Sequence, residues 1–220
     1  MAESAREMIL NRLDQSADIA EGNTDEQGIQ ENAQRLIEQS IHATLLSDNL
    51  TEAFCQRIKR GHVIGTTCDV VDSTDEIPAA VADYLATNEL DFDIAVQQAP
   101  IFDNIHWGPI KASGAELDGL EDGLVAVSTA DFGIAETSSV VFHSGENNPV
   151  LINFLSFHLI IVIKAETILA TLDDYATMAD TDKPVSKTVW ITGASGTADI
   201  EAVLVQGAHG PCQVHIIVVN

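Results

Sequence analysis

Basic residues are scarce in this 220-residue sequence: 10 lysines and arginines face 34 aspartates and glutamates, and the formal net charge is −24. This balance argues against nucleic acid and anionic membranes as partners, because both would be repelled. The acidic residues are spread along the whole chain and form no single block. Such a surface is typical of proteins that work in concentrated salt, where counterions screen the self-repulsion. We therefore expect a salt-adapted protein; the alternative is an ordinary acidic cytosolic protein.

The sequence also lacks an apolar run long enough to cross a bilayer. The longest candidate, VLINFLSFHLIIVI at 150–163, is too short and is interrupted by polar residues. The first residues, MAESAREMILNRLDQS, are charged and contain no apolar signal-peptide core. We expect a soluble, cytoplasmic protein with no membrane partner.

Cysteine is rare as well. The three cysteines, Cys55, Cys68 and Cys212, are far apart and form no Cys-x-x-Cys pair, which argues against an iron–sulfur or zinc-ribbon site. Their odd number argues against a disulfide framework, so we interpret them as small, part-buried hydrophobic residues. No spacing of His, Asp and Glu suggests a metal site, and no Gly-x-Ser-x-Gly motif occurs. We expect no metal or cofactor bound by this chain.

An apolar fraction of 45% indicates a folded protein, and the length suits one large domain or a domain with a helical appendage. A short helix is predicted over residues 3–15, followed by a polar, acidic linker at 16–32. A longer helix is predicted over about 29–60. We expect a break near 47–49, because Thr51 and Glu52 offer a new helix start.

Beyond this region, predicted strands and helices alternate. Strands are predicted within 62–72, 92–100, 153–165, 187–193 and 212–219, with two more around an irregular middle in 123–145. Helices are predicted at 75–88, 166–179 and 197–207. This order predicts an α/β fold with a largely parallel sheet. The near-continuous apolar strand at 153–165 should be buried on both faces. We expect a helical segment with an acidic loop at 1–60 and an α/β domain at 61–220.

The stretch ITGASGTADIEAVLVQG at 191–207 indicates a strand, a small-residue turn and a helix. Ser195 and Thr197 can cap the helix, and Asp199 and Glu201 suit its dipole. Alternatively, the free N–H groups of the turn bind a phosphate or carboxylate. The spacing alone favours capping, because neither a GxGxxG motif nor a P-loop lysine is present.

Three further residues are candidates for chemistry. Glu136 lies in a strongly apolar stretch, so it either faces solvent by alternation or is buried with a raised pKa, as a general base requires. His158 lies in an apolar strand, where a satisfied core histidine is the commoner outcome. His209 precedes Gly210, and the ordinary interpretation is a helix C-cap.

Four segments resemble one known family. ITGASGTADIEAVLVQGAHGPCQVHIIVV resembles the C-terminal signature of the lactate utilization protein C family, whose domain is the LUD domain. ADFGIAETSSVVF resembles the central motif of that family, FHLIIVIKAETIL a following strand motif, and SAREMILNRL its N-terminal helix. The resemblance implies an α/β fold of the NagB/RpiA/CoA-transferase-like type. It also implies a role in oxidising L-lactate to pyruvate alongside two iron–sulfur subunits, with no cluster on this chain.

The resemblance also assigns site residues. Glu136 and His158 are the catalytic candidates. The ligand-binding candidates are Thr137, Thr192, Gly193, Ser195, Thr197, Asp199, His209 and Gly210. Where the family has arginine, this chain has Gly196 and Cys212, and Ser138 stands where it has glycine. Two cations are therefore absent where an anionic ligand is expected. Either those arginines are structural, or this chain binds something different or binds weakly.

We therefore expect an accessory, cluster-free subunit of an iron–sulfur L-lactate oxidising system. The alternatives are an independent binder or enzyme for a CoA-, nucleotide- or folate-like anion, or a non-catalytic scaffold. We further expect the turn 193–197 at the carboxyl end of a sheet strand, where open α/β sheets bind ligands. There it should share a pocket with Glu136 and His158, and the first N–H groups of the following helix should face that pocket.

Overall fold

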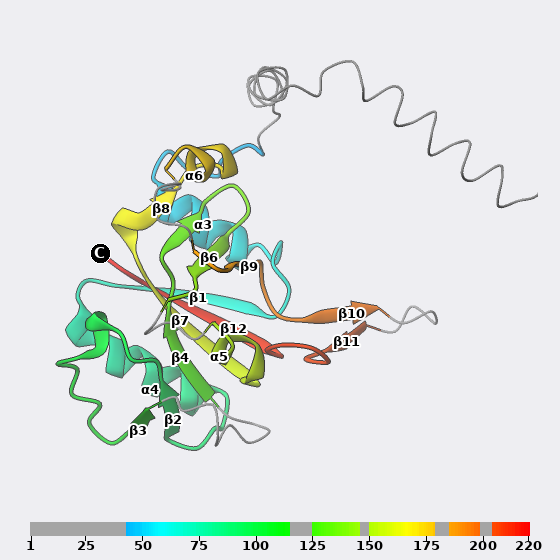
Figure 1. The fold of residues 1–220 in the computed structure, drawn as a ribbon. Coiled ribbons are helices and arrows are strands. Elements are labelled where there is room, and N and C mark those ends of the chain that lie inside the picture. Colours follow the sequence, from blue (N-terminus) through cyan, green and yellow to red (C-terminus); the bar gives the residue numbers. More distant parts are fainter. Residues whose placement is uncertain (1–42, 115–124, 146–149, 179–184, 199–203) are drawn as a thin grey trace, which may run out of the picture. The chain divides into compact units, whose positions relative to one another are not determined.

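The structure is a computed structural model that describes residues 43–114, 125–145, 150–178, 185–198 and 204–220. These residues belong to one compact unit, Ala43–Asn220 (Figure 1). The predicted helix at 3–15, the acidic linker at 16–32 and the helix from 29 to 42 lie outside the described residues.

A six-stranded sheet forms the centre of this unit, and every neighbouring pair in it is parallel. Its strands, in spatial order, are β1 (Thr66–Val71), β12 (Gln213–Val219), β7 (His158–Lys164), β4 (Val125–Thr129), β2 (Asp93–Val96) and β3 (Lys111–Gly114). The predicted parallel sheet is confirmed. The β7 strand has partners on both sides, and its first six residues are buried, as its apolar run predicts.

A second, four-stranded sheet was not predicted. Its strands, in spatial order, are β8 (Ile168–Leu169), β5 (Phe132–Ile134), β6 (Ser139–His143) and β9 (Thr188–Ile191). Only β5 and β8 are parallel; the other pairs are antiparallel. The stretch 123–145, expected to form two strands, therefore supplies three, of which β4 lies in the central sheet.

Alternate side chains of β7 enter two different cores. Leu159, Ile161 and Ile163 pack with helix α3 (Leu50–Lys59) and with residues of the second sheet. Ile160 and Val162 pack on the opposite face with helix α4 (Ile77–Thr87). The central sheet thus separates an α3 face from an α4 face, and this division decides which candidate residues can meet.

The helices begin where the sequence offers caps. Asn49 precedes α3, and its Oδ1 accepts a hydrogen bond from the N–H of Glu52 at 2.9 Å, which confirms the predicted break. A 3₁₀ turn (Thr74–Glu76) leads into α4, whose first turn contains a proline. The remaining short helices are a 3₁₀ turn at Pro100–Phe102, α5 (Ile152–Leu155), a 3₁₀ turn at Ala165–Thr167 and α6 (Leu172–Met178). The helix predicted at 166–179 is therefore α-helical only in its second half.

The helix predicted at 197–207 is wrong at the two ends that the structure describes. Strands β10 (Gly196–Ala198) and β11 (Leu204–Gln206) pair in antiparallel fashion, with Thr197 opposite Val205 (Figure 1). The backbone N–H of Gly207 donates to the carbonyl of Ser195 at 3.0 Å, which continues the hairpin ladder. Lateral pairing of β-branched residues outweighs the local capping signal of Ser195 and Thr197.

Candidate functional site

Glu136 lies in the turn between β5 and β6, and its side chain is buried. Its Oε1 accepts a hydrogen bond from the N–H of Leu172, the first residue of α6, at 2.7 Å. Its own N–H donates to the carbonyl of Ala170 at 3.0 Å. Of the two expected placements of this side chain, the structure shows the buried one and not the solvent-facing one. The carboxylate fastens α6 to the end of β5.

A chain of three hydroxyls begins next to Glu136. The Oγ1 of Thr137 lies 2.8 Å from the Oγ of Ser139, which lies 2.6 Å from the Oγ1 of Thr192. Ser139 is buried, whereas Thr192 is exposed, so the row of hydroxyls reaches the surface at Thr192. The pairing of β6 with β9 brings Ser139 and Thr192 together. Two motifs that are far apart in the sequence meet at this point.

Ser138, at the position of the family's glycine, has a φ of +53°, in the left-handed region that glycine adopts most easily. Its Oγ donates to the backbone carbonyl of Phe54 on α3 at 2.7 Å, and its side chain is fully buried. The hydroxyl thus ties the Glu136–Ser139 turn to α3.

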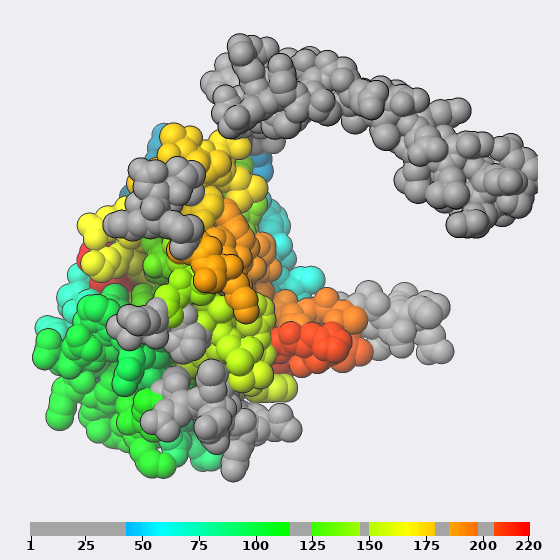
Figure 2. Space-filling model, in the orientation of Figure 1, coloured from blue at the N-terminus to red at the C-terminus, as the bar shows by residue number. Residues whose placement is uncertain are grey.

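The turn after β9 is held by the segments that precede β1 and β12. The N–H of Ala194 donates to the carbonyl of Ile64 at 3.0 Å, and the N–H of Ser195 to that of Pro211 at 2.8 Å. Gly193 has a φ of +87°, and a Cβ there would lie 2.6 Å from the Cγ1 of Val63. Figure 2 shows the surface around 190–198 in orange and that around 205–212 in red, side by side.

This position corrects an expectation. The turn does follow the carboxyl end of β9, but it packs at the amino edge of the parallel sheet, just before β1 and β12 begin. The ligand crevices of open α/β sheets lie at the opposite edge. Thr197 is exposed on β10, so the expected first N–H groups of a helix are absent at this described residue.

The remaining ligand candidates lie nearby or cannot be placed. His209 is exposed, and a Cβ on Gly210 would lie 3.3 Å from the Cβ of Ser195. Gly210 therefore packs closely on the turn. Asp199 lies outside the described residues, as does Glu201.

His158 does not join this group. It is the first residue of β7, and its Nδ1 lies 2.8 Å from the hydroxyl of Tyr84 on α4. Burial lowers the pKa of His158. Ile134 and Ala135, directly before Glu136, pack in the core on the α3 face. The pocket expected to contain both Glu136 and His158 is therefore wrong, because the alternation of β7 turns His158 toward the α4 face.

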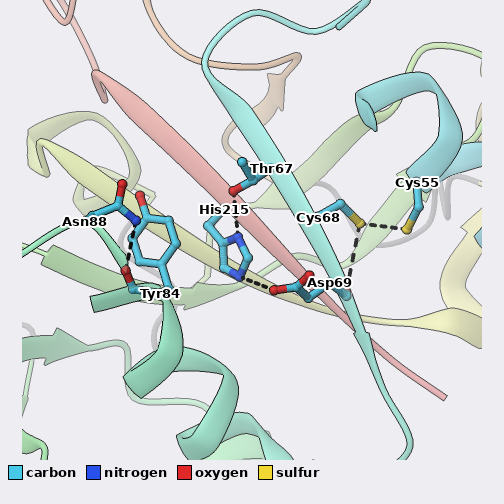
Figure 3. A network of polar contacts seen from close by, with 7 residues as sticks. All are labelled: Cys55, Thr67, Cys68, Asp69, Tyr84, Asn88 and His215. Atoms are coloured by element: carbon cyan, nitrogen blue, oxygen red, sulfur yellow. Dashed lines mark hydrogen bonds and ion pairs between the residues drawn. The ribbon is translucent and has the colours of Figure 1, made fainter. Parts of the chain in front are cut away.

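A second polar network surrounds His215 on β12 (Figure 3). Its Nδ1 lies 2.7 Å from the Oγ1 of Thr67, and its Nε2 lies 3.5 Å from Oδ2 of Asp69. The Tyr84 ring stacks on the imidazole with 4.6 Å between centroids. Burial lowers the pKa of His215 to about 4, against an opposing influence of Asp69, and burial raises the pKa of Tyr84 to about 12. This network has no local signal in the sequence, because Thr67 and His215 are 148 residues apart.

A third polar group covers the second sheet and was also missed. The Nε2 of His143 lies 2.8 Å from the hydroxyl of Tyr175, and its Nδ1 lies 3.7 Å from Oδ2 of Asp131. The Tyr175 ring packs edge-on against Phe132 and Trp190. These residues come from β5, β6, α6 and β9 or lie beside them, so only the folded sheet brings them together.

Among the residues that the structure describes, no group of three or more His, Cys, Asp or Glu side chains is placed to hold a metal ion. Within the same part of the chain, no helix combines the length and the apolar character needed to span a membrane.

Comparisons with known proteins agree with the fold. Residues 118–219 match the model of the LUD domain. Curated relatives include lactate utilization protein C of Geobacillus sp., 30% identical over 53% of this chain and 51% of its own length. The protein of the same name from Macrococcus caseolyticus is 28% identical over 80% of each chain. A third, the uncharacterized protein YkgG of Escherichia coli, is 29% identical over 52% of this chain and 51% of its own length.

Among solved structures, a DUF162 family protein from Deinococcus radiodurans superposes with a TM-score of 0.54 at 17% identity, covering 78% of this chain and 96% of that one. The central sheet and this likeness define an α/β protein. The domain match and the curated relatives go further: residues 118–219 match the LUD domain, and the chain is similar to proteins named lactate utilization protein C. The chain spans about half the length of several of its curated relatives.

Proposed function

We propose that this chain acts in L-lactate utilization, as an accessory, cluster-free subunit of a cytoplasmic iron–sulfur system that oxidises L-lactate to pyruvate. Relatives named lactate utilization protein C support this proposal, one of them across 80% of the chain. The structural observation that carries it is the contact between the two family motifs, in which Ser139 lies 2.6 Å from Thr192.

The oxidation of lactate to pyruvate removes two electrons and two protons, and the proposed iron–sulfur partners accept the electrons. This chain would contribute the hydroxyl chain of Thr137, Ser139 and Thr192 beside Glu136. Hydroxyl groups can donate to a carboxylate, but each neutral bond is weaker than one from a guanidinium. With Gly196 and Cys212 in place of the family's arginines, anion binding by this chain is expected to be weak.

Purification from the native host tests the proposal. The tagged full chain is isolated from cells grown on L-lactate, and iron and lactate-dependent dye reduction are measured in the eluate. We expect iron-bearing partners and dye reduction to co-elute with the chain. A chain that elutes alone, or with a bound nucleotide or CoA-like anion, would instead support the independent binder or the scaffold.

A matched pair of variants tests the hydroxyl chain. Thr192→Val replaces the hydroxyl at the exposed end of the hydroxyl chain with an isosteric methyl group. This variant should lower the dye reduction several-fold. Thr188→Val removes an exposed hydroxyl at the start of β9, the strand that Thr192 follows, and should leave the dye reduction unchanged. Equal rates for the two variants would remove the hydroxyl chain from the proposal but leave the accessory role standing.

A further inference from the structure

Two of the three cysteines face each other between α3 and the edge strand β1. The Sγ atoms of Cys55 and Cys68 lie 2.6 Å apart, although the residues are 13 positions apart in the sequence (Figure 3). Both are free thiols, and their side chains are 4% and 5% exposed. The separation is only about half an ångström more than the ~2.05 Å of a disulfide bond. A bond between them therefore requires little movement of either element.

Each cysteine of the pair lines a surface hollow. A hollow of about 420 Å³ is lined by Cys55 together with Glu52, Gln56 and Lys59. A second hollow, of about 630 Å³, is lined by Cys68 and again by Lys59. Each cysteine thus borders a hollow large enough for a small oxidant, and Lys59 lines both hollows.

The two thiols are not equivalent. The hydrogen bond with Cys68 holds the pKa of Cys55 below its usual range, and the charge of Lys59, one helical turn further along α3, acts in the same direction. The same bond and burial raise the pKa of Cys68. Cys55 is therefore the more acidic thiol of the pair, the one that forms the reactive thiolate more readily.

We propose that Cys55 and Cys68 form a reversible dithiol–disulfide pair, oxidised by hydrogen peroxide. The Cys55 thiolate attacks one peroxide oxygen, and the O–O bond breaks. Hydroxide leaves, and Cys55 becomes a sulfenic acid. The Cys68 thiol then attacks the Cys55 sulfur, the S–O bond breaks, and water leaves. Two thiols and one peroxide give one disulfide and two water molecules, so the protein loses two electrons and two protons.

The disulfide would fasten α3 to the central sheet. The residue before Cys55, Phe54, accepts the hydrogen bond of Ser138 from the turn that contains Glu136. The oxidation state of the pair therefore acts on the helix that anchors this turn.

The test uses the full chain, treated with one equivalent of hydrogen peroxide and then alkylated after denaturation. The reduced chain should take three alkyl groups, and the oxidised chain one, on Cys212. Trypsin cleaves at Arg57, Lys59 and Arg60, so a linked pair of peptides containing Cys55 and Cys68 should appear in the digest. Dithiothreitol should restore all three labels. The closed loop should also raise the melting midpoint by roughly 5–10 °C.

Two single variants test the order of attack. In Cys68→Ser, Cys55 should stop as the sulfenic acid and be trapped by dimedone; in Cys55→Ser, no dimedone adduct should form. Three labels after oxidation, a disulfide to Cys212 or equal dimedone labelling of both variants would overturn the proposal. The alkylation and peptide measurements use the native sequence, so they decide it even if neither variant folds.

Discussion

Ser138 occupies a backbone conformation that suits glycine, and its hydroxyl offsets part of that cost. Its φ is +53°, and its Oγ holds the carbonyl of Phe54 across the core of the α3 face. A left-handed non-glycine residue costs about 1–2 kcal/mol, and a buried hydrogen bond contributes about 0.5–1.5 kcal/mol. Serine in place of the family's glycine thus gives up backbone freedom at position 138 and gains a hydrogen bond to α3.

Two substitutions at this position separate the two effects. Ser138→Ala keeps the strained φ but loses the bond, and should reduce the free energy of unfolding by about 1 kcal/mol. Ser138→Gly loses the same bond but relieves the strain, and should be about 1 kcal/mol more stable than the alanine variant. Urea unfolding measures both. An alanine variant as stable as the glycine variant would contradict the strain at Ser138.

His215 makes the stability of the fold depend on pH. Its pKa is about 4 in the folded protein because it is buried, against about 6.5 in an unfolded chain. Below pH 6.5 the unfolded state therefore binds more protons, so stability is complete above pH 6.5 and falls toward pH 4. For this one residue the loss amounts to about 3 kcal/mol. Burial lowers the pKa of His158 too, with the same sign.

The measurement is the free energy of unfolding between pH 4 and pH 7 for the native chain and for His215→Asn. The variant should be less stable at pH 7, because it loses the stack with Tyr84, but its pH dependence should be shallower. His106→Asn, at an exposed histidine, is the control and should retain the native slope. If His215→Asn showed the same pH dependence of the free energy of unfolding as the native chain, the pKa of His215 would not differ between the folded and unfolded states.

At the scale of elements, the periodicity of the sequence predicted much of the central sheet and failed where tertiary pairing decides the conformation. The apolar runs of β7 and β12 predicted buried parallel strands because two-sided burial leaves a local pattern. The segment 196–206 carries helix-capping residues, yet its described ends pair as a hairpin. The helix predicted from 166 begins only at Leu172, because Ile168 and Leu169 extend the second sheet. Neither the pairing of β10 with β11 nor the late start of α6 can be predicted from the residues of those segments alone.

The turn after β9 depends on the absence of a side chain at Gly193. A Cβ there would meet the Cγ1 of Val63 at 2.6 Å and the carbonyl of Ile64 at 2.9 Å, and its φ is positive. Gly193→Ala should therefore lower the free energy of unfolding by about 3 kcal/mol, from backbone strain and overpacking together.

Gly61 is the matched control for this prediction. Its φ is also positive, at +73°, but nothing lies within 4 Å of an added Cβ. Gly61→Ala should cost only the backbone strain, about 1 kcal/mol. Thermal or urea unfolding of the two variants gives the comparison. Equal losses would mean that the turn is not packed against the segment before β1.

At the scale of the whole molecule, charge dominates. Thirty-four acidic residues face ten basic ones, and self-repulsion at low ionic strength opposes the compact state. We propose that the chain is adapted to salt, and its melting midpoint should climb between low salt and molar KCl as counterions screen the carboxylates. Scanning calorimetry over a KCl series measures it. A melting midpoint that does not change with KCl would contradict the adaptation to salt, and the chain would be an ordinary acidic protein.

The candidate site could be predicted from the sequence only in part. The resemblance directed attention to Glu136, Thr137 and Thr192, and the structure places these residues in one neighbourhood. It also included His158, which lies on the other face because one step along a strand reverses a side chain. Ser139, which joins the two motifs, has no distinguishing feature in the sequence; its role follows from the β6–β9 register.

Growth of the native host on L-lactate tests the central claim most directly. A strain that lacks this chain is grown with L-lactate or with pyruvate as the sole carbon source, and then complemented with the native sequence. The account predicts that the deletion abolishes growth on L-lactate, spares growth on pyruvate, and is repaired by the native chain. Undiminished growth of the deletion strain on L-lactate would contradict it.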